Sequence, residues 1–300
     1  LSFYPIILVF FKKHILWGFV FVVSLENIKI LMYNSEDVKS ENIIKEKIMA
    51  RIDSFKHALE EKRAVKVIAG IDNFDIENIK KVVSSAETAH ASAVDICSRE
   101  DIVKEIRSMT DLPLFVSSIV PSELVKAVDL GADAIELGNF DVLYKQGTSF
   151  DANDVLALVE ETKALLGDRE VFFSVTIPGE ISTADQVALA VKLESMGVDL
   201  IQTEGHYVSD SNLSGARALM DRAELTISNT IELVRNVEMP IMTATGINPT
   251  TAPFAFAAGA SAIGCGSCIN KLSSNISMIA TISSLVEIAN KNAVKVRAFV

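Results

Sequence analysis

Short apolar segments alternate with amphipathic helical patterns along most of this chain. The apolar segments predict eight strands, over residues 64–69, 93–96, 114–117, 134–137, 171–177, 199–203, 241–245 and 262–265. Between them, apolar residues recur every three or four positions, as at Ile76, Ile79 and Val83, which is typical of a helix with one buried face. Strands that alternate with helices indicate a parallel sheet.

The number of these units decides between two parallel architectures. Eight strand–helix units in about 240 residues fit the usual size of a (β/α)8 barrel, or TIM barrel. The alternative, an open doubly wound sheet, places its glycine-rich turn after the first strand. Here the glycine-rich turns follow the last two strands. We therefore predict an α/β fold, a (β/α)8 barrel over residues 63–300.

The N-terminal residues do not share this alternation. Residues 1–31 are apolar, and their two uncharged runs are each shorter than the roughly 20 residues that a membrane-spanning helix needs. We interpret them as a leader outside the fold: translated upstream sequence, a signal or a membrane tether. Membrane contact is expected only if residues 1–25 are retained. Residues 32–62 predict a polar lead-in and a helix.

Glycines end the seventh and eighth predicted strands. Residues 240–247 read P-I-M-T-A-T-G-I, and residues 260–267 read A-S-A-I-G-C-G-S. Glycine lets a backbone approach a ligand closely, and the helix that follows favours an anion at its N-terminus. The loops after strands 7 and 8 commonly hold phosphate in such barrels. The predicted phosphate contacts are Gly246, Ile247, Gly264, Gly266 and Ser267.

Charged residues interrupt several strands where a barrel would bury them. Lys66 lies in strand 1, Asp95 in strand 2 and Glu136 in strand 4, while Glu204 follows strand 6. A buried charge needs a partner. These four residues are therefore our candidate catalytic residues for proton transfer, and the competing interpretation is a salt-bridged polar core. Polar residues on strands 5, 6 and 7 extend the ring, namely Ser174, Thr176, Gln202, Thr243 and Thr245.

Composition and charge exclude several classes of protein. The chain has 300 residues, 49% of them hydrophobic, which excludes disorder as the main state. Its net charge of −11 argues against nucleic-acid binding, which requires an excess of Lys and Arg. Three cysteines favour a reducing compartment. Cys265 and Cys268 form a C-x-x-C motif, but without a second ligand pair the surrounding glycines explain this segment better. No motif for a metal or cofactor is present, so none is expected.

Five separated motifs resemble one family, the hypothetical chloroplast reading frame 23 family of cyanobacteria and algal plastids. They read R-A-V-K-V-I-A-G-I-D-N-F-D (63–75), A-D-A-I-E-L-G-N-F-D (132–141), F-S-V-T-I-P (173–178), D-L-I-Q-T-E-G (199–205) and T-A-P-F-A-F-A-A-G-A-S-A-I-G-C-G-S (251–267). The resemblance covers about residues 52–290 and departs from the family pattern at residues 206–212. It implies a barrel of the ribulose-phosphate-binding type, an uncharacterised activity and a plastid stroma or a cyanobacterial-type cytoplasm.

These observations favour an enzyme acting on a small phosphorylated metabolite, with isomerase, aldolase or lyase chemistry. The alternative is a non-catalytic barrel that senses such a metabolite. A membrane-tethered scaffold ranks third. Self-association into a homo-oligomer is left open.

Overall fold

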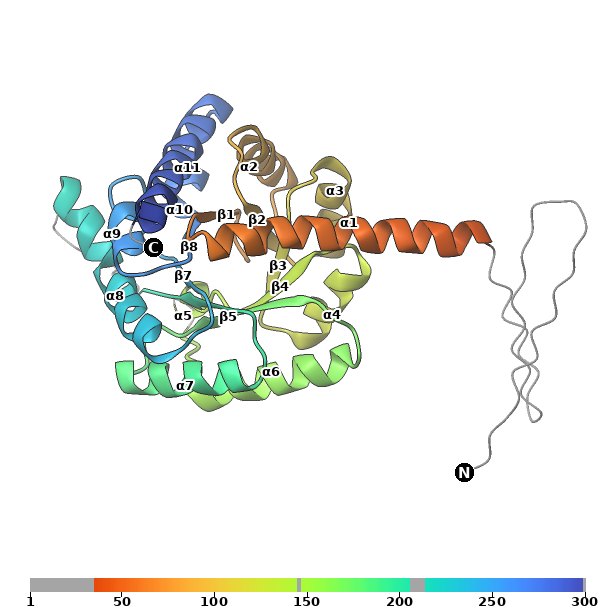
Figure 1. Cartoon of the computed structure of the whole chain (residues 1–300), viewed down its shortest axis with the longest axis horizontal. Coiled ribbons are helices and arrows are strands. Elements are labelled where there is room, and N and C mark those ends of the chain that lie inside the picture. Colours follow the sequence, from red (N-terminus) through yellow and green to blue (C-terminus); the bar gives the residue numbers. More distant parts are fainter. Residues whose placement is uncertain (1–34, 145–146, 206–213, 299–300) are drawn as a thin grey trace, which may run out of the picture. The chain divides into compact units, whose positions relative to one another are not determined.

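The computed structural model describes residues 35–144, 147–205 and 214–298, so the expectation for residues 1–31 lies outside the described residues. Eight parallel strands close into one barrel in sequence order, with helices around it (Figure 1). This confirms the predicted (β/α)8 fold. The strands are β1 (Ala64–Ile68), β2 (Ala93–Cys97), β3 (Leu114–Ser118), β4 (Ala134–Leu137), β5 (Phe172–Ile177), β6 (Leu200–Thr203), β7 (Ile241–Thr243) and β8 (Ala262–Cys265).

Helices follow the strands, and two short helices lie in strand–helix loops. The long helices in the ring carry apolar residues at helical spacing and bury them against the strands. The extra helices are α5 in the loop after β4 and α10 in the loop after β8. The helices are α1 (Ser35–Glu60), α2 (Ile76–Thr88), α3 (Glu100–Met109), α4 (Pro121–Asp129), α5 (Asp141–Tyr144), α6 (Ala152–Leu166), α7 (Thr183–Ser195), α8 (Gly215–Asn236), α9 (Ala252–Ala257), α10 (Ser267–Asn270) and α11 (Asn275–Ala298).

Strand β7 ends two residues earlier than its apolar pattern predicts. Thr245 and Gly246 both have positive φ, 67° and 75°, so the chain leaves the extended conformation after Thr243. No periodicity in the sequence T-A-T-G-I distinguishes the end of the strand from the start of this turn. The loop that should follow strand 7 therefore begins inside the predicted strand.

A repeated polar residue fixes the start of the sheet. Three even-numbered strands are preceded by a serine or an aspartate, and in each case its side chain accepts a hydrogen bond from an N–H group of the preceding strand. This satisfies a strand amide that the ladder leaves unpaired. The bonds join Val65 N to Ser92 Oγ (3.0 Å), Leu114 N to Asp133 Oδ2 (2.9 Å) and Phe173 N to Asp199 Oδ2 (2.8 Å).

The barrel interior consists of two layers of opposite character. The lower layer, towards the N-terminal ends of the strands, is apolar: Ala64, Ala93, Phe115, Ala134, Phe172, Leu200, Met242 and Ala262 pack into one cluster. Two residues further along six of these strands lie Lys66, Asp95, Ser117, Glu136, Ser174 and Gln202, all buried. Because side chains alternate with a period of two along a strand, these polar residues point to the same interior one layer higher.

Helix α1 closes the lower end of the barrel. The chain divides into the compact units Leu1–Ala50 and Arg51–Val300, and the second unit contains the last part of α1. Phe55 has no exposed surface, and its ring makes edge-on contacts with Phe115 and Phe172, with centroids 5.0 and 5.7 Å apart. The N-terminal helix predicted before the barrel is therefore part of the barrel core from Arg51 onward.

A charged cluster fastens this helix to the strands. The Asp133 carboxylate, 2% exposed, accepts hydrogen bonds from the Arg51 Nε (2.9 Å) and the Arg107 Nη1 (2.7 Å) as well as from the Leu114 amide. Charge-assisted bonds of this kind are stronger than neutral ones. One carboxylate thus joins α1, α3 and the start of β4.

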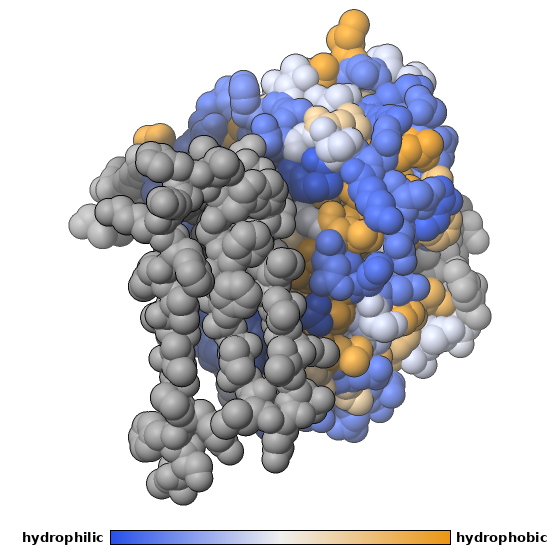
Figure 2. Space-filling model, turned by 90° about the vertical axis from the view of Figure 1, so that its right-hand side faces the viewer, coloured by the Kyte–Doolittle hydropathy of each residue, from blue (hydrophilic) through white to orange (hydrophobic). Residues whose placement is uncertain are grey.

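One face of the molecule is mainly polar. The face shown in Figure 2 is mainly hydrophilic, with hydrophobic residues scattered between the charged ones. Scattered exposed apolar residues need no special explanation.

We expect Phe55→Ala to destabilise the barrel. The substitution removes a fully buried ring from the lower layer, and losses of about 3–5 kcal/mol are usual for such changes. Phe254→Ala is the matched control, because Phe254 on α9 is 50% exposed and should cost less than half as much. Urea unfolding followed by circular dichroism measures both. Equal losses for the two variants would contradict the role of Phe55 in closing the barrel.

Candidate functional site

The upper interior layer holds an ion pair at its centre. The Lys66 Nζ lies 2.5 Å from the Glu136 Oε2, and neither side chain has exposed surface. Three further donors reach the Glu136 carboxylate: Ser174 Oγ (2.8 Å), Gln202 Nε2 (3.0 Å) and Asn139 Nδ2 (3.2 Å). Both oxygens of Glu136 are therefore occupied by partners from four other positions of the barrel.

Asp95 belongs to the same cluster but is differently placed. Its Oδ1 accepts a hydrogen bond from the Ser117 hydroxyl (2.5 Å), while its buried Oδ2 has no hydrogen-bond partner in the described chain. Burial raises the pKa of Asp95 to about 7; the Lys66 charge opposes this rise, and the Glu136 charge adds to it. A carboxyl group that titrates near neutral pH and has one free oxygen is suited to proton transfer.

Glu204 lies outside this cluster. Its Oε2 accepts hydrogen bonds from the Tyr144 hydroxyl (3.0 Å) and the Gly179 N–H (3.4 Å), which connects the segments that follow β4, β5 and β6. The structure thus brings Lys66, Asp95 and Glu136 together and places Glu204 among the loops at the carboxyl ends of the strands. The catalytic roles of all four remain predictions.

The loop after β7 is shaped around Gly246. Its φ of 75° is one that glycine adopts without strain, and a Cβ at this position would lie 2.6 Å from the Arg222 carbonyl oxygen on α8. The Gly246 carbonyl accepts hydrogen bonds from Asn248 Nδ2 and Thr251 Oγ1, both at 3.0 Å. These bonds fix the orientation of the Gly246 carbonyl. The N–H group of the same residue therefore lies on a constrained turn.

The glycines around β8 occupy two different environments. Gly264 lies within the strand, opposite Lys66, and a Cβ there would approach Ala244, Ile68 and the Gln202 Oε1 within 3.0–3.2 Å. It therefore makes room inside the barrel. Gly266 lies past the strand and begins α10, with Ser267 exposed as the first residue of that helix. A short extra helix after strand 8 is the element that completes phosphate sites in barrels of this type.

Several backbone donors and buried acceptors of the described chain have no partner. Within the described residues, the N–H groups of Gly246, Ile247 and Gly266, after β7 and β8, donate no hydrogen bond. Three buried side-chain oxygens lack a partner as well: Asp95 Oδ2, Gln202 Oε1 and Asn270 Oδ1. Buried polar atoms without partners are rare in native proteins, and a bound molecule or water is a common reason for them.

The sequence analysis missed some contributors and misplaced one. Asn139 has a positive φ of 67°, donates to Glu136 and accepts from the Gln202 amide (3.0 Å). Its position after a glycine at a strand end was the available signal, since Asn tolerates this conformation. The placement of Thr243 in the interior ring was wrong. Its hydroxyl contacts Thr230 on α8 (2.7 Å), because the period of β7 directs Met242 inward instead.

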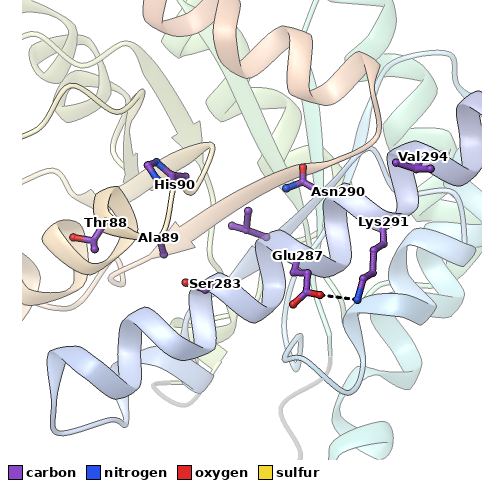
Figure 3. Close-up of a pocket in the computed structure, with 9 residues that line it drawn as sticks. Thr88, Ala89, His90, Ser283, Glu287, Asn290, Lys291 and Val294 are labelled. Atoms are coloured by element: carbon purple, nitrogen blue, oxygen red, sulfur yellow. Dashed lines mark ion pairs between the residues drawn. The ribbon is translucent and has the colours of Figure 1, made fainter.

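Two surface pockets of the described chain lie away from the polar interior. One of about 510 Å³ lies between α11 and the α2–β2 turn, where Figure 3 shows His90 opposite Asn290 and the Glu287–Lys291 ion pair (2.7 Å). Another, of about 440 Å³, lies between α8 and α9. Among the described residues, no cluster of three or more metal-binding side chains is found, and no helix is long and apolar enough to cross a membrane.

Comparison with known proteins places the chain among relatives of unknown activity. Residues 49–295 match the family described as "Protein of unknown function (DUF561)". The chain is 37% identical to the uncharacterized protein ycf23 of Cyanophora paradoxa, over 76% of this chain and 92% of the relative. It is 36% identical to the ycf23 protein of Pyropia yezoensis, over 73% and 80% of the two chains.

Solved structures with the same fold are more distant. Thiamine phosphate pyrophosphorylase from Pyrococcus furiosus has a TM-score of 0.52 and 17% identity, over 78% of this chain and 98% of that one. (S)-3-O-geranylgeranylglyceryl phosphate synthase from Thermoplasma acidophilum, solved with its substrate sn-glycerol-1-phosphate, has a TM-score of 0.54 and 15% identity, over 79% and 98%. At this identity the likeness establishes the barrel fold alone.

We expect Asp95→Asn to change how stability depends on pH. Because the folded pKa of Asp95 is raised from 3.8 to about 7, the folded state binds the proton more tightly, and stability falls as pH rises from about 4 to about 7. The Asn variant does not lose this stability as pH rises. The stability of the variant minus that of the native chain should therefore be larger at pH 8 than at pH 4, by roughly 4 kcal/mol at most. Urea unfolding across this pH range measures the difference. Parallel pH profiles would contradict the burial of a titrating Asp95.

We expect the Lys66–Glu136 pair to show strong coupling. Lys66→Met or Glu136→Gln alone leaves a buried charge without its partner and should cost about 3–5 kcal/mol. The double variant removes both charges and should recover part of that loss. A double-mutant cycle by urea unfolding measures the coupling, and purely additive losses would show that the pair does not act as a unit.

Proposed function

The chain belongs to the ycf23 family, whose activity is unknown, and we propose that it binds and acts on a small phosphorylated metabolite. The observation that carries this proposal is the group of unpaired N–H groups at Gly246, Ile247 and Gly266, on the loops after β7 and β8. Unpaired backbone N–H groups on adjacent loops suit a phosphate.

The fold and its neighbours support the same ligand class. Loops after strands 7 and 8, together with a short extra helix, form the usual phosphate site of this architecture, and α10 has that position here. Several solved barrels of this fold are named for phosphorylated compounds, among them 3-hexulose-6-phosphate synthase, whose TM-score is 0.52 and identity 14%. A functional guess from fold likeness is an analogy, so the argument depends on the site residues.

The upper layer supplies the remaining part of the proposed site. The buried oxygens Asp95 Oδ2 and Gln202 Oε1 lack donors, which suits a ligand that carries hydroxyl groups into the barrel. Asp95 would exchange the proton, because its pKa of about 7 makes both protonation states available near neutral pH. Lys66 and Glu136 would hold a fixed arrangement of charge around Asp95. Glu204 would hold the loops after β4, β5 and β6 in position. Isomerase, aldolase and lyase reactions all require such a proton transfer.

A sensing barrel without turnover is the second candidate. The observation that favours it is the Glu136 carboxylate, which accepts four hydrogen bonds from the protein itself. A carboxylate whose oxygens are occupied by donors of the protein itself is typical of a structural ion pair. In this alternative, the interior layer holds the barrel in shape, and ligand binding is transmitted to a partner.

The remaining expectations about cellular context are also proposals. We propose a plastid stroma or a cyanobacterial-type cytoplasm as the location, in keeping with the family. Residues 1–31 would form a leader outside the fold, and residues 32–62 a lead-in and helix before the barrel.

We expect phosphate to raise the melting temperature, and Ser267→Asp to abolish most of that increase. The new carboxylate would stand beside the proposed anion and weaken its binding by about tenfold or more, or about 1.4 kcal/mol. Ser54→Asp is the matched control: Ser54 is also exposed but lies on α1, at the opposite end of the barrel. Thermal melts with inorganic phosphate and with a mixture of phosphorylated metabolites measure the effect. No increase with any phosphate compound would reject both candidate functions.

The same mixture distinguishes an enzyme from a sensor. Mass spectrometry of the mixture before and after incubation detects conversion. An enzyme should convert at least one compound, and Asp95→Asn should lose that conversion by about 100-fold or more while retaining the thermal response to phosphate. A thermal response without conversion of any compound supports the sensor.

A further inference from the structure

The C-x-x-C motif has a structural context that its sequence does not reveal. Cys265 is the last residue of β8 and is fully buried, whereas Cys268 lies in α10 and is partly exposed. The two residues between them are Gly266 and Ser267, and Gly266 accepts backbone hydrogen bonds from Ile269 (2.9 Å) and Asn270 (3.0 Å). These bonds start α10 directly after Gly266, so Cys268 lies on the first turn of the helix that follows the end of β8.

The two thiols lie three positions apart and influence each other's ionisation. Interaction with Cys268 and burial raise the pKa of Cys265 well above its usual value, whereas interaction with Cys265 and the nearby Lys271 charge lower the pKa of Cys268. An accessible sulfur with thiolate character next to a buried thiol is the arrangement in which dithiols exchange with disulfides.

Metal binding does not account for this pair. Among the described residues, no third cysteine, histidine or carboxylate completes a group that could hold a metal ion. Structural zinc sites use four such ligands. Cys97, the remaining cysteine, is buried in β2.

We propose that Cys265 and Cys268 form a redox-active dithiol, with Cys268 as the attacking sulfur and Cys265 as the resolving one. The oxidant is a disulfide. The Cys268 thiolate attacks one of its sulfurs, which forms a mixed disulfide and releases one thiolate. Cys265 then gives its proton to the released thiolate and attacks the Cys268 sulfur, which forms the internal disulfide and releases the second thiolate. That thiolate takes up the proton that Cys268 gave to the solvent when it ionised. The oxidant gains the two electrons and two protons that the cysteines lose.

Equilibration with oxidised and reduced dithiothreitol tests this proposal. After quenching in acid and alkylation, mass spectrometry of the full chain should show Cys265 and Cys268 protected together at high oxidant, and Cys97→Ser should behave like the native chain. Circular dichroism must show that the fold is retained. A native chain whose two thiols both remain alkylatable at every ratio would overturn the proposal, as would a disulfide that forms only in urea.

Single variants test the assigned order of the two sulfurs. With glutathione disulfide, Cys265→Ser should accumulate a stable mixed disulfide on Cys268, whereas the native chain should resolve it. Cys268→Ser should leave Cys265 unmodified. At pH 7, iodoacetamide should modify Cys268 of the native chain at least about tenfold faster than Cys97. Equal rates, or a mixed disulfide on Cys265, would show that the roles are wrong.

Discussion

A lysine and two carboxyl groups buried inside a closed barrel set the conditions for the rest of this structure. Each of these charges is costly to bury alone, and the cost falls only where partners are fixed within hydrogen-bonding distance. Lys66 and Glu136 meet this condition by pairing at 2.5 Å, and the pair influences the third charge, Asp95. The barrel must therefore be closed and rigid below them, which explains why an apolar layer and α1 fill the lower end.

The same constraint distinguishes the two acids that the interior holds. Glu136 receives four donors and is held in one position by its surroundings. Asp95 receives one, keeps an unpartnered oxygen and has a pKa of about 7. Two carboxyl groups in one cluster thus have different surroundings, and burial raises the pKa of Asp95, which accepts a single hydrogen bond.

Much of this arrangement follows from residue periodicity. Strand–helix alternation predicted the eight strands, and single charges within apolar strands predicted that Lys66, Asp95 and Glu136 share an interior. Periodicity fails where the backbone turns: β7 ends at Thr243 because Thr245 and Gly246 have positive φ, and Thr243 consequently faces α8. Periodicity also does not predict which loop residues form hydrogen bonds with the buried carboxylates. Asn139 and Tyr144 reach the carboxylates only because of how the loops after β4 fold, and no local pattern specifies that.

The loop after β8 shows how one short segment serves two purposes. Its glycines are needed for close packing, since Gly264 makes room beside Gln202 and Gly266 passes against the Ile68 carbonyl. The turn that follows also carries Cys268, three residues after Cys265 at the end of β8. The segment proposed to contact an anion is therefore also the segment that carries the proposed thiol pair. A disulfide across Gly266 and Ser267 would limit the conformations of the same backbone that is proposed to contact phosphate, so the chemistry of the thiols and the geometry of the anion site depend on one turn.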